Sequence, residues 1–71
     1  MNYILEQYDR SKSNKLIIGS YKTFDEALSE ALKIMNPLIK NSKEEIKEII
    51  DPKSEYGYIQ VGQLDCRVIK M

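Results

Sequence analysis

The chain has 71 residues, and its eleven basic and eleven acidic side chains cancel. A chain of this length is expected to form a single domain over residues 1–71 with a thin core, and its neutral charge disfavours binding to a nucleic-acid backbone. The single cysteine and the absence of histidine exclude an internal disulfide and a zinc site with the usual nitrogen and sulfur ligands.

Targeting signals are also missing from the sequence. No basic segment followed by an apolar run opens the chain, and the apolar runs elsewhere are short. We therefore expect neither a signal peptide nor contact with a membrane. An unpaired thiol suits a reducing compartment, so the expected localisation is cytoplasmic.

The amino-terminal part predicts a β-hairpin. Residues 2–8 and 15–21 are rich in Tyr, Ile and Leu, and they flank the polar stretch 9–14.

A helix is predicted to begin after Thr23, because Thr23 and Glu26 have the spacing of a capping box. Its apolar positions are spaced by three and four: Phe24, Ala27, Leu28, Ala31, Leu32 and Met35. The Asn36-Pro37 pair predicts that this helix ends near Met35, since a residue before proline is driven out of the helical conformation.

Two interpretations remain open for residues 37–51. One is a second helix that begins at Pro37; the other, which we prefer, is a loop followed by a short helix capped by Ser42. The stripe of Ile46, Ile49 and Ile50 would then face the core.

Residues 56–61 and 64–69 predict two further strands joined by a tight turn at Gly62-Gln63. The order is ββααββ. The predicted fold class is α+β, with an antiparallel four-stranded sheet and one long and one short helix on one face.

The side chains left on the far face of that sheet are the most informative feature. If Ile59 packs beneath the helix, Tyr58 points away, and the same alternation puts Arg67 outside. The first hairpin adds Ile4, Tyr8, Ile17 and Tyr21 if Leu5, Leu16 and Ile18 point inward. A solvated sheet face normally carries polar residues, so this composition favours association. The residues expected at the contact are Tyr8, Tyr21, Tyr56, Tyr58, Arg67, Arg10 and Lys12.

Enzyme chemistry is not expected. There is no histidine to act as a general base, and no Gly-rich phosphate loop. Acidic pairs such as Asp25 with Glu26 fall on predicted helix surfaces, and Cys66 is expected to be a small core residue. No cofactor or metal is predicted.

The stretch from Tyr56 to Val61 is similar to the central part of the aromatic RNA-binding strand of RRM domains. The predicted element order differs from the βαββαβ order of that family, and Ser54-Glu55 replaces its basic residue. We therefore assign no family.

The sequence predicts a non-enzymatic interaction protein that acts as a small oligomer, binding itself and another protein through the tyrosine-rich sheet face. Small size and missing chemistry motivate the hypothesis of a phage or mobile-element inhibitor of a host or defence protein. One alternative is a protein that binds or sequesters a nucleotide-sized ligand. A further alternative is weak binding of nucleic acid.

Overall fold

Five strands and one helix make up the secondary structure of residues 2–71, the residues that the computed structural model describes. In chain order they are β1 (Tyr3–Asp9), β2 (Asn14–Tyr21), α1 (Phe24–Asn41), β3 (Ile46–Asp51), β4 (Tyr56–Val61) and β5 (Leu64–Lys70). The α+β class is confirmed, but the predicted count of four strands and two helices is wrong.

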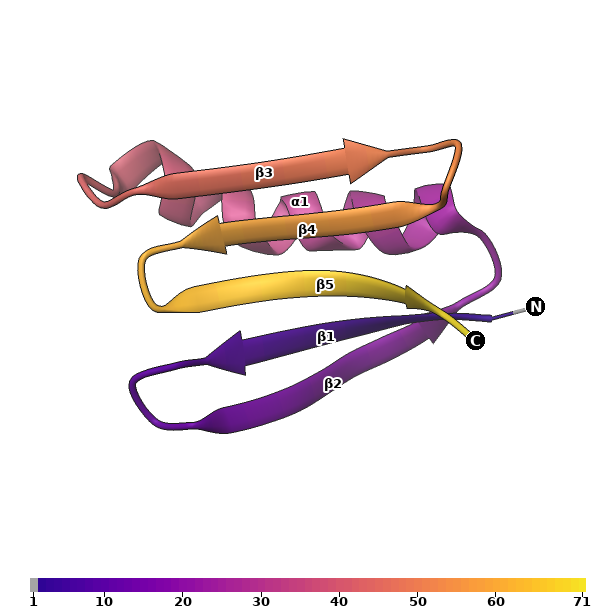
Figure 1. Ribbon diagram of the computed structural model, residues 1–71, viewed down its shortest axis with the longest axis horizontal. Helices are drawn as coiled ribbons and strands as arrows, with labels where there is room; N and C mark the ends of the chain where they lie inside the picture. The colour runs from indigo at the N-terminus through magenta and orange to yellow at the C-terminus, as the bar shows by residue number, and fades with distance from the viewer. Residues whose placement is uncertain (1) are drawn as a thin grey trace.

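The sheet is antiparallel throughout, and its spatial order is β2-β1-β5-β4-β3. The hairpin β1–β2 and the run β3–β5 are separate in sequence and join where β1 pairs with β5. At that junction Met71 N donates to Asn2 O at 2.9 Å. The helix α1 links the two halves by crossing one face of the sheet, so the five strands lie in front of it in Figure 1.

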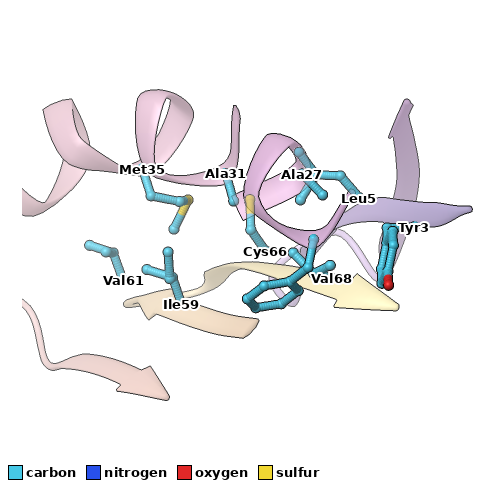
Figure 2. Close-up of a cluster of buried hydrophobic side chains, with 10 residues drawn as sticks. Tyr3, Leu5, Ala27, Ala31, Met35, Ile59, Val61, Cys66 and Val68 are labelled. Atoms are coloured by element: carbon cyan, nitrogen blue, oxygen red, sulfur yellow. The ribbon is translucent and has the colours of Figure 1, made fainter. Parts of the chain in front are cut away.

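The core lies between α1 and the central strands. The helix packs mainly against β5, β1 and β4, and its buried side chains Ala27, Ala31 and Met35 face the sheet residues drawn in Figure 2. The predicted cap is present, since Glu26 N donates to the Thr23 hydroxyl at 3.1 Å. Cys66 is buried in this core as expected.

The helix continues six residues beyond its predicted end near Met35, to Asn41, with Pro37 inside it. Proline removes one backbone donor, but Pro37 lies on the exposed side, where water can satisfy the carbonyl left without a partner. Leu38 and Ile39 pack against the core in the last turns. Tertiary packing therefore outweighs the local stop signal.

The segment after the helix is a strand, so both interpretations of residues 37–51 are wrong. Ile46, Ile49 and Ile50 belong to β3, which pairs with β4. β-Branched side chains suit a pleated strand, and the three isoleucines form too narrow a stripe to hold a second helix on the core. The edge of β4 was available, and this segment covers it.

The predicted alternation in the carboxy-terminal strands is confirmed. Ile59, Cys66 and Val68 are buried beneath α1, while Arg67 lies on the opposite face beside Tyr58. Gly62 has a φ of 60° in the predicted turn.

The alternation in β2 is interrupted by a bulge. Leu5 pairs with Gly19 but Glu6 pairs with Ile17, so Ile18 is an extra residue opposite β1. The bulge turns Tyr21 to the side of α1, where it packs against the core. The expectation that Tyr21 shares the far face with Ile17 is therefore wrong.

Candidate functional site

The sheet face opposite α1 is not covered by any segment of residues 2–71, and we call it the open face (Figure 1). Alternate residues of all the strands supply it, and the register brings them into rows. The middle row runs across the sheet through Ile17, Glu6, Arg67, Tyr58 and Ile49. The row beside it runs through Lys15, Tyr8, Asp65, Gln60 and Lys47.

Tyr58 and Asp65 form the centre of this face, and both are buried although no helix covers them, at 8% and 5% exposure. The Tyr58 hydroxyl lies 3.0 Å from Gln60 Oε1 and 3.4 Å from Asp65 Oδ2, and it can donate its one proton to either. Gln60 is held in turn by its bond to Gly62 O at 3.0 Å. A hydrogen-bonded network is therefore built into the face.

Arg10 closes this network from the β1–β2 turn. Its Nη2 donates to the Tyr58 hydroxyl at 2.9 Å, and its Nε lies 3.4 Å from Asp65 Oδ2. The backbone of Arg10 is fixed as well, because its N–H donates to Gln63 O at 2.8 Å. A buried carboxylate needs such a cation and hydrogen bonds to offset its desolvation.

Burial raises the pKa of the Tyr58 hydroxyl, and the negative charge of Asp65 raises that pKa further. The hydroxyl is therefore protonated at neutral pH. The network therefore holds a protonated hydroxyl that can donate a hydrogen bond.

Arg67 lies beside Tyr58 with its guanidinium carbon 5.7 Å from the centre of the tyrosine ring. The residue is exposed, and within residues 2–71 it forms no ion pair. The guanidinium of Arg67 is therefore held in position by the Tyr58 ring, and its N–H donors are exposed to solvent.

Two shallow hollows flank Arg67 on the open face. The first, about 520 Å³, lies over β1 and β5 and is lined by Glu6, Tyr8, Arg10, Lys15, Asp65 and Arg67. The second, about 410 Å³, is lined by Arg10, Glu45, Lys47, Ile49, Tyr56, Tyr58, Gln60 and Arg67. Lys15 lies 3.7 Å from Glu6 and Arg10 pairs with Asp65, so charges in the first hollow are largely matched.

Five of the residues predicted at the contact lie on this face: Tyr8, Tyr56, Tyr58, Arg67 and Arg10. Tyr21 lies on the other face, and Lys12 is in the exposed β1–β2 turn, where its N–H bonds to Asp9 O. Tyr58 is buried within the network, so the exposed tyrosine of this group is Tyr56, at 38%.

The sequence reasoning missed the roles of Asp65, Gln60 and Lys47. The alternation that places Arg67 on the far face places Asp65 there too, but nothing predicted that Asp65 would be buried and paired with Arg10. The signal that could have found it was the register, which places Asp65 opposite Tyr8 at the end of β1, next to the turn that carries Arg10.

The single cysteine of the described chain is buried in the core. Burial raises the pKa of the Cys66 thiol to about 11, which keeps it protonated and unreactive. Residues 2–71 hold no cluster of acidic or sulfur ligands able to bind a metal ion. No helix in this part of the chain is long and apolar enough to cross a membrane.

Comparison with known proteins gave no match: no family model, no curated protein and no solved structure matches this chain.

Proposed function

We propose that this chain is a non-enzymatic interaction protein that binds another protein through its open face. The observation that carries the proposal is the composition of this uncovered surface. Ile17, Ile49 and Tyr56 are exposed to 53%, 51% and 38%, and Ile17 and Ile49 lie at the two ends of the row that contains Tyr58, whose hydrogen-bonded network is already ordered. Because each of these side chains is already about half-buried or more, complete burial by a partner contributes about 1 kcal/mol per side chain.

The charges indicate what the partner presents. Arg67 is stacked on Tyr58, and Lys47 lies in the same hollow. Neither cation forms an ion pair within residues 2–71. Arg and Tyr are favoured at interface hot spots because they bury a large area and keep donors for a charged partner group. The partner that fits carries a carboxylate flanked by apolar side chains.

Preorganisation of the Tyr58 network favours tight binding. Tyr58 and Asp65 are held by several hydrogen bonds before any partner arrives, so little side-chain entropy is lost at the centre of the contact. A protein of this kind acts by covering a surface of its target, which is also how an inhibitor of a host or defence protein would work.

The test is partner capture with matched variants. Immobilised wild-type chain is compared with the double variant Arg67→Ala/Tyr56→Ala, which changes two exposed residues of the open face. Lys33→Ala, on the exposed side of α1, is the control. We expect a protein held by the wild type and by the control but lost from the double variant. Equal capture by all three chains would place the contact elsewhere.

A second candidate is binding of an anionic, nucleotide-sized molecule in the hollow beside Tyr56. Its volume of about 410 Å³ and its lining of Tyr56, Lys47 and Arg67 favour this alternative. Thermal melts and tyrosine fluorescence with a panel of nucleoside mono-, di- and triphosphates distinguish the two. A melting temperature raised by one nucleotide in the wild type, but not in Arg67→Ala, would favour the small ligand.

A further inference from the structure

The strand β3 forms one edge of the sheet and is the most exposed element in the described chain. Of its residues only Ile50 is half-buried, and Ile46 and Ile49 are exposed to 40% and 51%. β4 is its neighbour on one side, and no strand of residues 2–71 lies on the other. An uncovered edge with apolar side chains is a template for pairing with another strand.

The direction of the free backbone groups follows from the turn beside β3. Gly62 N donates to Glu45 O at 3.2 Å, so the backbone groups of Glu45 point toward β4. Because these groups alternate along an antiparallel strand, those of Ile46, Glu48 and Ile50 point outward. The outward amides and carbonyls are therefore available for a further strand.

The opposite edge of the sheet, formed by β2, is less suited to pairing with an added strand than β3 is. β2 carries the bulge at Ile18, which disrupts regular pairing at that edge. β3 pairs with β4 without a register shift over Ile46–Asp51. Regular pairing with an added strand is consequently possible at β3 and hindered at β2.

The charges along β3 select a partner strand and a register. Two copies of β3 in antiparallel pairing can be centred on Glu48, Ile49 or Ile50. Centring on Glu48 opposes two like carboxylates, and centring on Ile50 limits the pairing to residues 49–51 and opposes Ile49 to Asp51 of the second copy. Centring on Ile49 places Lys47 opposite Asp51 of the second copy, and symmetry repeats this pair.

The same register matches the apolar side chains. Ile49 lies opposite Ile49 of the second copy, in the closer kind of antiparallel pair, where the residues exchange no backbone bonds. Pro52 follows Asp51, the last residue of β3, and has no N–H, so the ladder can end there without losing a backbone donor. The strand is therefore complementary to itself in charge and in apolar contact.

We propose that β3 pairs antiparallel with β3 of a second copy of this chain, centred on Ile49, so that the two sheets join into one. The two-fold axis of such a pair is perpendicular to the sheet, so both helices lie on one side and both open faces on the other. The dimer presents two adjacent binding faces in one plane. Edge pairing needs no other protein, so it is tested on the purified chain alone; in the dimer Lys47 pairs with Asp51, which leaves Arg67, among residues 2–71, as the unpaired cation of each open face.

The test uses charge exchange in purified protein, with mass measured by sedimentation velocity across a wide range of concentration. Lys47→Asp leaves only acidic residues at positions 47 and 51, and Asp51→Lys leaves only basic ones. We expect the wild type to dimerise, each single variant to remain monomeric, and an equimolar mixture of the two variants to form a heterodimer. Circular dichroism melts verify that both variants are folded.

A backbone variant gives a second, independent measurement. Glu48→Pro removes an outward N–H without touching the β3–β4 bonds, and Glu48→Ala keeps that N–H as the control. We expect loss of the dimer in Glu48→Pro alone. A wild type that is monomeric at every concentration would overturn the proposal, as would a dimer that persists in Lys47→Asp and in Glu48→Pro.

Discussion

Arg10 Nη2 donates a 2.9 Å hydrogen bond to the hydroxyl of Tyr58, which lies 48 residues further along the chain. The bond connects the turn of the first hairpin to β4 across the intervening strands. Asp65 shares the same guanidinium. Because Tyr58 and Asp65 are buried, this cluster holds the fold together as well as shaping the open face.

The first prediction concerns this cluster. Arg10→Ala leaves the buried Asp65 carboxylate without its cation, so we expect a loss of about 2 kcal/mol in the free energy of unfolding. For a domain of this size, this loss lowers the melting temperature by roughly 8–16 °C. Lys12→Ala, in the same turn, is the control and should melt like the wild type. Adding Asp65→Asn to Arg10→Ala should recover part of the loss, and no recovery would contradict the assigned charge pairing.

The second prediction concerns the proline inside α1. Pro37→Ala restores a backbone donor in the helix interior, and its exposed position gives the new side chain no clash. We expect the free energy of unfolding to rise by about 1–2 kcal/mol, after allowing for the greater freedom of the unfolded chain. Urea denaturation followed by circular dichroism measures it. A less stable variant would mean that Pro37 contributes a contact that outweighs the missing hydrogen bond.

The third prediction concerns the turn between β4 and β5. Gly62 has a φ of 60°, and a Cβ there would overlap the carboxylate of Glu44. We expect Gly62→Ala to cost about 1–2 kcal/mol, from backbone strain together with displacement of Glu44. The double variant Gly62→Ala/Glu44→Ala removes the clash but keeps the strain. Its thermal melt should therefore fall between those of the wild type and the single variant.

The fourth prediction concerns acid stability. The Glu55 carboxylate accepts hydrogen bonds from Lys70 Nζ and from the Tyr3 hydroxyl, and these bonds lower the pKa of Glu55, with Lys70 contributing most. A pKa lowered by folding adds stability above the unfolded value of about 4.3, and this stability is lost as pH falls through the folded pKa. Melts from neutral to acidic pH should show the loss.

Glu55→Gln is the matched variant for this measurement. Hydrogen bonds from Ser11 and Ser54 also lower the pKa values of Asp9 and Asp51, so both proteins lose stability in acid. The variant should start from a lower melting temperature at neutral pH and lose less on acidification. Parallel pH profiles for the two proteins would show that Glu55 contributes nothing to the acid response.

Local sequence patterns by themselves determined the hairpin 2–21, the start of the helix at Thr23, and the two carboxy-terminal strands with their faces. Helix capping and the two-residue alternation of strands depend only on residues that are close together in the chain. Both can therefore be predicted from a short stretch of sequence. The composition of the open face followed from that alternation, as did the location there of Tyr56 and Arg67.

Tertiary structure alone decided the features where a distant contact outweighed a local signal. α1 passes Pro37 because Leu38 and Ile39 gain burial against the core, and β3 forms because β4 offered an unpaired edge to the isoleucines. The burial of Asp65 likewise depends on Arg10, which lies far away in sequence. These outcomes are set by the sum of long-range burial and pairing energies, which no short window of residues contains.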